Sequence, residues 1–395
     1  MLMATTLNQS EPDLKSMMAA IEPARLRATV EKLASFQTRN TLSATLPEAA
    51  EWLAGEYRKI PGMKVEVMTY AAPKGRRVPE DRQVVQVVAT LPGADDRMVL
   101  VGGHMDSLNL QADVMTGRAP GANDDASGTA AALEIARAMA GRKWAHTLVF
   151  VGFTGEEQGL LGSRALAQRA KAEGWKLDAV LSNDTVGSSG NKAGQADPRR
   201  VRIFSAEWAP RATAAGAPEA NANPRHNSRE LARFIEFATR GKVADFGVKL
   251  VMRQDRYGRG GDHTPFAEEG FSAVRLVEVH EEYTRQHTPD DLPEFMDWNY
   301  LANVARLNLV AMSALAEAGA PPEDVRMELL QLGHEARVQP GVGLRDNPGR
   351  TTLPQPLSRE LADRLQHAEA RLLVGVGLHL HQALAHQGSK HVKQR

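Results

Sequence analysis

The chain has 395 residues, no cysteine, and equal numbers of basic and acidic residues, 48 of each. This length exceeds the size at which a single hydrophobic core usually stops growing, so we expect one large domain with an appendage. The balanced charge offers no net attraction to nucleic acid or to an anionic membrane, and no apolar stretch is long enough to cross a bilayer. The absence of cysteine excludes disulfides and thiolate zinc sites.

Helical and strand patterns alternate along most of the chain. Apolar side chains at helical spacing predict helices over residues 23–38, 47–59, 129–140, 160–173 and 300–316. Apolar runs between turn residues predict strands over residues 64–70, 83–91, 98–102, 147–153, 179–183, 201–205, 249–252 and 273–277. This alternation indicates an α/β fold with a mixed, largely parallel sheet and helices on both faces. The hairpin-like start adds antiparallel strands at one edge.

Side chains that can bind metal follow the ends of predicted strands. Four of them lie at or just beyond such an end and a fifth lies in a later loop: His104, Asp124, Glu157, Asp184 and His287. Because ligands of open α/β sheets bind outside the carboxyl ends of the strands, we expect these side chains to converge there. Two imidazoles mixed with carboxylates suit a pair of zinc-like ions better than calcium, which prefers oxygen alone. If one carboxylate bridges the two ions, positions stay open for water and substrate, and such a site performs hydrolysis.

The neighbours of these residues suggest supporting roles. Asp106 follows His104 in a His-x-Asp pattern and is placed to fix the second ring nitrogen of the histidine. In the pair Glu156–Glu157, one carboxylate can bind metal while the other moves a proton. Each motif taken alone also has a structural interpretation: a capped histidine, a solvated helix start, or, for Asp124–Asp125, an N-terminal helix cap. Their joint occurrence at successive strand ends favours the metal site.

In its motifs the chain resembles peptidase family M28, the co-catalytic zinc aminopeptidases. The segments that carry the resemblance are Gly-Gly-His-Met-Asp (102–106), Pro-Gly-Ala-Asn-Asp-Asp-Ala-Ser-Gly (120–128), Gly-Glu-Glu-Gln-Gly-Leu-Leu-Gly-Ser (155–163), Asn-Asp (183–184), Gly-Gly-Asp-His-Thr-Pro-Phe (260–266) and Gln-His-Thr (286–288). The resemblance covers residues 23–318. It implies a zinc-exopeptidase-like α/β/α sandwich and a catalytic domain over residues 1–318.

The resemblance also implies a division of roles. His104 and Asp184 would hold one Zn²⁺, Glu157 and His287 a second, and Asp124 would bridge them. Glu156 would act as general base on a water shared by the two metals. A tyrosine often contacts the oxyanion in relatives, for which Tyr257 is the first choice and Tyr283 the second, although Tyr257 equally fits a loop anchor. The pair Asp262–His263 we interpret as structural or supporting.

The function that follows is removal of N-terminal residues from peptides, so the expected partners are peptides with a free N-terminus and neither nucleic acid nor a membrane. Alternatives of the same fold are a glutaminyl-cyclase-like enzyme with one zinc, a carboxypeptidase or an amidohydrolase. A non-enzymatic binding ectodomain should have lost ligands or the base, and none is missing here. The start of the chain shows no signal segment. By resemblance we expect a secreted or periplasmic protein, with the cytoplasm as the alternative.

Three segments carry weaker expectations. Residues 187–200 and 209–229 are loops that follow the ligand strands and either wall the substrate pocket or form mobile surface, which is the favoured interpretation. Residues 319–395 depart from the family: a Pro- and Gly-rich stretch precedes apolar residues at helical spacing, which favours an amphipathic helix for packing or dimerisation. The five histidines of this tail fit a solvated face better than a metal site.

Overall fold

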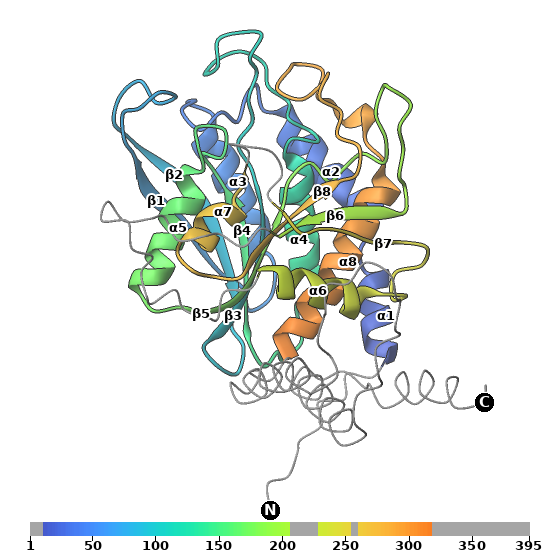
Figure 1. Ribbon diagram of the computed structural model, residues 1–395. Coiled ribbons are helices and arrows are strands. Elements are labelled where there is room, and N and C mark those ends of the chain that lie inside the picture. The colour runs from blue at the N-terminus through green and yellow to red at the C-terminus, as the bar shows by residue number, and fades with distance from the viewer. Residues whose placement is uncertain (1–10, 206–227, 254–259, 318–395) are drawn as a thin grey trace, which may run out of the picture. The chain divides into compact units, whose positions relative to one another are not determined.

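A mixed eight-stranded sheet forms the centre of the protein in a computed structural model that describes residues 11–205, 228–253 and 260–317 (Figure 1). The strands lie in the order β1-β2-β4-β3-β5-β8-β6-β7. Their bounds are β1 Lys64–Ala72, β2 Arg82–Leu91, β3 Arg97–His104, β4 Thr147–Phe153, β5 Lys176–Asn183, β6 Arg200–Phe204, β7 Gly247–Val251 and β8 Ala273–Glu278. The central strands β4, β3, β5 and β8 run parallel, and both edges contain reversed strands, because β2 is antiparallel to β4 and β6 is antiparallel to β8.

Helices cover both faces of this sheet. Their bounds are α1 Glu11–Ala19, α2 Pro23–Ser35, α3 Leu46–Arg58, α4 Ala126–Met139, α5 Leu161–Ala172, α6 Ser228–Thr239, α7 His263–Glu268 and α8 Trp298–Glu317, with a 3₁₀ turn at Pro293–Phe295. On one face α3 and α4 pack on the strands, with α1, α2 and α8 beside α4; on the other face lie α5, α6 and α7 (Figure 1). The predicted α/β sandwich is therefore confirmed.

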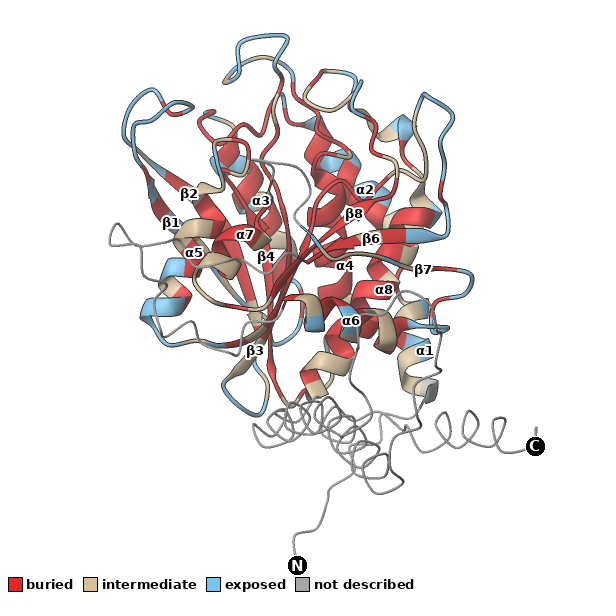
Figure 2. Ribbon diagram, viewed as in Figure 1, coloured by how far each residue is buried: buried red, intermediate tan, exposed pale blue. Residues whose placement is uncertain are grey.

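Burial follows position in the sheet. All seven residues of β4 (Thr-Leu-Val-Phe-Val-Gly-Phe) are buried, as expected for a central strand with helices on both faces. The edge strand β1 instead alternates between exposed and buried or half-buried positions. Figure 2 shows the buried residues concentrated in the central strands and the inner sides of the helices, with exposed residues mainly in the loops.

Helix α4 approaches the sheet closely because glycines stand at the contact. A Cβ atom on Gly103 of β3 would lie 2.4 Å from the backbone carbon of Gly128. A Cβ atom on Gly128 would lie 2.4 Å from the carbonyl oxygen of Asn183 at the end of β5. Both glycines therefore let the first turn of α4 press against the ends of β3 and β5, where the candidate ligands lie.

The predicted elements all occur, with small shifts of their ends, and the expected antiparallel start is formed by β1 and β2. The sequence patterns missed α1, α6 and the short α7, and gave no sign that β6 and β7 run against the central strands. The loop at 187–200 lies within the described residues, as does its isolated bridge between Gly190 and Ala196. The expectations for most of 209–229, for Tyr257 and for 319–395 fall outside the described residues.

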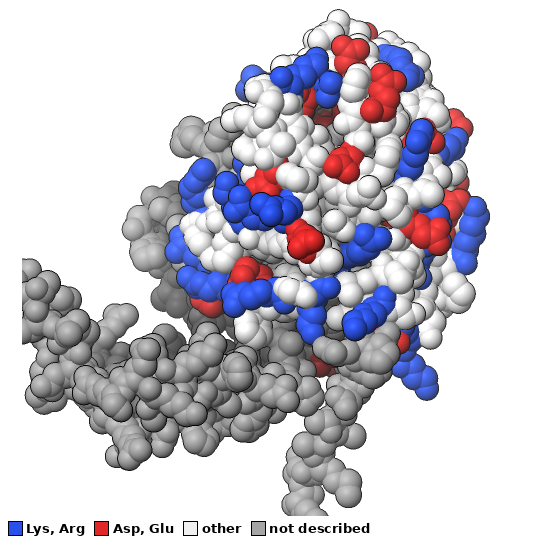
Figure 3. All heavy atoms as spheres, turned by 90° about the vertical axis from the view of Figure 1, so that its right-hand side faces the viewer, with Lys and Arg blue, Asp and Glu red and all other residues white. Residues whose placement is uncertain are grey.

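The surface carries both signs of charge. On the face drawn in Figure 3, Lys and Arg side chains are interspersed with Asp and Glu, in keeping with the equal numbers of the two types. Within the ranges that the structure describes, no helix combines the length and apolar character needed to span a membrane.

Candidate metal centre

The carboxyl ends of the four parallel strands bring the five predicted ligands together. His104 is the last residue of β3, Asp184 directly follows β5, and Glu157 lies four residues beyond β4. Asp124 lies in the turn that enters α4, and His287 lies in the loop after β8. Residues up to 183 positions apart in the chain thus meet at one edge of the sheet, as the sequence predicted.

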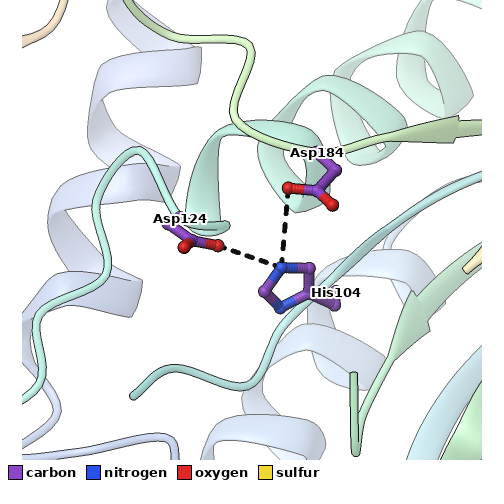
Figure 4. A group of neighbouring side chains, drawn as sticks. All are labelled: His104, Asp124 and Asp184. Atoms are coloured by element: carbon purple, nitrogen blue, oxygen red, sulfur yellow. Dashed lines mark ion pairs between the residues drawn. The ribbon is translucent and has the colours of Figure 1, made fainter. Parts of the chain in front are cut away.

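His104, Asp124 and Asp184 form the first group (Figure 4). The Nε2 atom of His104 lies 3.1 Å from Oδ1 of Asp124 and 3.9 Å from Oδ1 of Asp184. His104 is 1% exposed, and each of the two carboxylates is 4% exposed. The surrounding protein therefore shields these three side chains almost completely from solvent.

Asp124 also belongs to a second group, with Glu157 and His287. The Nε2 atom of His287 lies 3.1 Å from Oδ2 of Asp124 and 3.1 Å from Oε1 of Glu157. Gln286 donates a hydrogen bond of 2.7 Å to the same Oδ2 atom. The two oxygens of Asp124 therefore face different histidines, which is the geometry that a bridging carboxylate requires.

The donor atoms fit one metal ion in each group. Two atoms bound to the same tetrahedral zinc at about 2.1 Å lie about 3.4 Å apart. The separations in the two groups range from 3.1 to 3.9 Å, and within each group the donor atoms lie within 4.8 Å of one another. Imidazole nitrogen and carboxylate oxygen are also ordinary zinc ligands. The residues present thus suit two zinc-like ions.

The electrostatics of the site favour positive charge between the carboxylates. Burial alone would lower the pKa of His104, but its contacts with Asp106 and Asp124 outweigh burial and hold the pKa well above the ordinary value. Burial would also lower the pKa of His287, but the contacts with Asp124 and Glu157 outweigh it and raise this pKa to about 11. The pKa of Asp124 stays well below its ordinary value, against the effect of burial, because both histidines contact it.

Glu156 and Glu157 lie on the wall of a cavity of about 650 Å³ that also contains the other ligands. Glu157 is buried and Glu156 is half-buried. Burial raises the pKa of Glu156 well above its ordinary value, and the nearby carboxylates of Asp184 and Glu157 raise it further. Glu156 belongs to neither ligand group, so it presents a carboxyl beside the centre that is not needed to hold an ion.

Two aspartates next to ligands have supporting contacts. The Oδ1 atom of Asp106 lies 3.4 Å from Nδ1 of His104, and its backbone oxygen lies 3.1 Å from the same nitrogen, so the predicted support of the ring is present. Asp125 caps α4 by accepting a hydrogen bond from Gly128 N, and it also accepts one from the backbone N–H of His104. The peptide bond between Asp124 and Asp125 is cis. The cap predicted for the pair is therefore made by Asp125, which leaves Asp124 for the centre.

The structure adds three supporting residues that sequence reasoning missed. Arg39, 0% exposed, donates hydrogen bonds to the carbonyl oxygens of Met105 and Gly121. Asp291 accepts hydrogen bonds from the backbone N–H groups of Asn123 and Asp124.

Arg275 is the third supporting residue, and its guanidinium lies 2.9 Å from Oδ2 of Asp184. Each of the three side chains reaches a ligand segment far away in the chain. No spacing in the sequence signals these contacts, because only the folded arrangement of the strands creates them.

The remaining predicted residues are distributed as follows. Asp262 and His263 stand at the start of α7, outside both ligand groups, as the supporting interpretation required. Burial raises the pKa of Asp262 to about 7 and lowers that of His263 to about 3. The hydroxyl of Tyr283 lies 2.8 Å from Oε1 of Glu281, and Tyr283 is not among the residues that line the cavity of the centre. Tyr257 lies outside the described residues.

Comparisons with known proteins place these features in context. Residues 86–312 match the family model of peptidase family M28. A protein of Pyricularia oryzae named "Probable zinc metalloprotease" is 38% identical, over 82% of this chain and 70% of its own length. The fold is similar to that of the LapA aminopeptidase of Legionella pneumophila, with a TM-score of 0.60, 20% identity, and coverage of 80% of this chain and 78% of that one. It is also similar to a glutaminyl cyclase of Fimbriiglobus ruber, with a TM-score of 0.55, 18% identity, and coverage of 74% and 95%.

Proposed function

Because the chain belongs to peptidase family M28, we propose that it is a two-zinc exopeptidase that removes N-terminal residues from peptides. The observation that carries this proposal is the pair of ligand groups that share Asp124, with Glu156 beside them in one cavity. A centre for a single ion would not need both oxygens of Asp124 to face separate histidines.

In this proposal His104 and Asp184 hold one ion, Glu157 and His287 hold the other, and Asp124 bridges the two. When bound, the ions activate water and stabilise negative charge that develops on the scissile carbonyl. Asp106 keeps the His104 ring oriented through its contact with Nδ1. This contact supports a positioning role for Asp106 and not direct contact with substrate.

Glu156 is the proposed general base. Its carboxylate takes a proton from the attacking water and delivers it to the departing amine, a role that needs a carboxylate within hydrogen-bond reach of the water. The acidic wall of the cavity also suits the free α-ammonium of a peptide, since a desolvated ammonium needs carboxylate or carbonyl acceptors. A peptide would therefore enter with its N-terminus first and leave the rest of its chain toward the mouth.

The test combines metal analysis with a substrate panel. Purified protein is assayed for bound metal by elemental mass spectrometry and for hydrolysis of aminoacyl-p-nitroanilides before and after chelation. We expect about two zinc ions per chain and activity that chelation removes and zinc restores. The variant Glu156→Gln serves as the control: it should keep its metal and lose about 100- to 10,000-fold in turnover. Loss of zinc from this variant would instead make Glu156 structural.

A second arm separates the peptidase from the cyclase of the same fold. A peptide with N-terminal glutamine is incubated with the protein, and the products are separated by mass. Release of free glutamine supports the exopeptidase. A mass loss of one ammonia, together with one zinc per chain and no hydrolysis of the panel, would support a cyclase and overturn the proposal.

A further inference from the structure

The mouth of the cavity bears positive charge on one hairpin loop. Residues 73–81 connect β1 to β2, and residues 73–78 of this loop line the same cavity as the two ligand groups. Three of its residues are basic and exposed: Lys74, Arg76 and Arg77. The inner wall of the cavity is acidic by contrast, since four of the residues that line it are Asp124, Glu156, Glu157 and Asp184. We call these four carboxylates, among which the two histidine ligands and Arg275 also lie, the acidic floor, and the exposed side chains of Lys74, Arg76 and Arg77 the basic rim.

The basic rim is fixed to the centre. Gly75 and Val78 form an isolated antiparallel bridge across the loop, and Val78 is 3% exposed, so it anchors the hairpin in the core. Arg77 donates a hydrogen bond of 2.6 Å to the backbone carbonyl of Glu157. The backbone N–H of Lys74 is bound by the carboxylate of Asp81 at 2.6 Å. The backbone of the loop and the side chain of Arg77 are therefore held at a defined place beside the ligand segment.

Two members of the rim have no internal task. Within the part of the chain that the structure describes, the side chains of Lys74 and Arg76 take part in no hydrogen bond or ion pair, whereas Arg77 is engaged by Glu157. Both side chains are consequently available to an anion at the mouth.

In the proposed exopeptidase, the substrate peptide is the natural source of such an anion. A peptide bound with its ammonium at the acidic floor extends past the mouth with the residues that follow the cleaved bond. The negative groups it can present there are carboxylates, either at the C-terminus of a short peptide or on an acidic side chain. A cavity of about 650 Å³ lies in the range that encloses a small ligand.

We propose that the basic rim is a carboxylate-binding subsite in which Lys74 and Arg76 select peptides that carry a carboxylate shortly after the cleaved bond. This inference rests on the proposed exopeptidase function and adds the substrate class. Since the side chains are exposed, each contact contributes modestly, and we expect a preference of roughly 5- to 30-fold that weakens as salt is raised.

The test compares matched peptides on the zinc-loaded enzyme. The substrates are X-Gly-Gly as the free acid and as the C-terminal amide, and X-Asp-Gly-amide with X-Asn-Gly-amide, where X is the residue cleaved fastest as its p-nitroanilide. We expect the wild type to have a higher kcat/KM for at least one carboxylate-bearing peptide than for its partner without that carboxylate. The first pair reports a C-terminal carboxylate and the second pair an acidic side chain, so the two arms identify the source.

The double variant Lys74→Gln/Arg76→Gln should abolish this preference and leave hydrolysis of the p-nitroanilide, which carries no carboxylate, unchanged. The matched control is Lys143→Gln/Arg199→Gln, which removes the same charge at two exposed positions outside the cavity and should keep the preference. Measurable but equal cleavage by the wild type of peptides with and without the carboxylate, or a preference that survives in the double variant, would overturn the proposal.

Binding distinguishes failure of the subsite from failure of the function. Calorimetry of the four uncleaved peptides on the zinc-loaded Glu156→Gln protein measures Kd without turnover. A carboxylate preference in Kd that the double substitution removes supports the rim even if the wild type hydrolyses none of the panel, a result that counts against the exopeptidase alone. Equal Kd values for acid and neutral peptides count against the rim whatever the activity.

Discussion

The two histidines of the centre are held by different means. His104 ends a central strand and is 1% exposed, and its ring and backbone contact Asp106 and Asp125. His287 lies in a loop, 30% of its side chain is exposed, and its backbone adopts a left-handed φ of 59°. Its carbonyl oxygen accepts a hydrogen bond from Leu110 N, which helps to fix the loop.

This difference indicates what each position depends on. His104 takes its place from the sheet, so the same packing that folds the core also places this ligand. His287 takes its place from local loop contacts and a backbone conformation that non-glycine residues rarely adopt. We therefore expect damage at His104 to affect folding and metal together, and damage at His287 to affect mainly metal.

The largest effect is expected at Asp124, the residue that the two ligand groups share. Asp124→Asn keeps the size of the side chain but weakens the ligand that both groups share. Bound zinc should fall from about two ions to less than one per chain, and activity should fall by about 1,000-fold or more. Elemental analysis after dialysis against a weak chelator measures the loss. Retention of two ions would contradict the bridging role.

The variants His104→Ala and His287→Ala test whether the strand position and the loop position contribute differently to stability. In metal-free protein, His104→Ala leaves buried carboxylates without their positive partner and should cost about 3–5 kcal/mol in the free energy of unfolding. His287→Ala also removes a contact from the buried carboxylates of Asp124 and Glu157, but 30% of its side chain is exposed, so water replaces part of that contact and the cost should be smaller, about 1–2 kcal/mol. Both variants should lose metal and activity.

Urea denaturation of the two metal-free proteins gives the difference. Equal losses of stability would show that the sheet and the loop hold their ligands equally, which would contradict the expected difference between His104 and His287. A larger loss for His287→Ala would reverse it.

A smaller effect is expected from Arg39→Met. Arg39 ties the segment after His104 to the turn before Asp124 through the carbonyls of Met105 and Gly121. Loss of these hydrogen bonds should weaken zinc binding by about 10- to 100-fold, as for other residues that support ligands. Competition with a fluorescent chelator measures the affinity. Arg27→Met, at an exposed arginine of α2 (its side chain is 59% exposed), serves as the control, and equal affinities of the two variants would contradict the positioning role.

The smallest effect is the pH dependence of the free energy of unfolding, and it comes from Glu278, which belongs to neither ligand group. Burial raises the pKa of Glu278 well above its ordinary value, more than its hydrogen bonds from Asn123 and Ser188 lower it. The folded state therefore keeps a proton that the unfolded state loses above about pH 4.3, so this group lowers stability as the pH rises.

Glu278→Gln should thus become more stable relative to wild type between pH 5 and pH 8, by about 1 kcal/mol or more. Denaturation at several pH values measures the trend, and Glu48→Gln at an exposed position is the control. A stability difference that does not change with pH would contradict the shift.

Much of this arrangement could be predicted from the sequence. The central strands are largely apolar runs, and His104, Glu157 and Asp184 lie at or within four residues of a strand end, so both the sheet and the convergence at its edge were foreseeable. Asp124, in the turn that enters α4, and His287, in a later loop, are brought to this edge by the fold. The reversed direction of β6 and β7 was not, because a short apolar run carries no information on its direction. Neither was Arg275 beside Asp184, since it comes from the interior of β8, where a buried arginine reads as an interruption of an apolar strand.

The absence of cysteine has a practical consequence when it is combined with the placement of the centre. The turn that leads from β2 into β3 lies at the amino-terminal ends of the parallel strands, opposite the ligands, and Ala94 in this turn is exposed. An Ala94→Cys substitution would introduce a thiol that no other residue of the chain can compete with. A fluorophore or a solid support coupled there would leave the mouth of the cavity facing the solution, which provides oriented attachment for single-molecule or biosensor measurements.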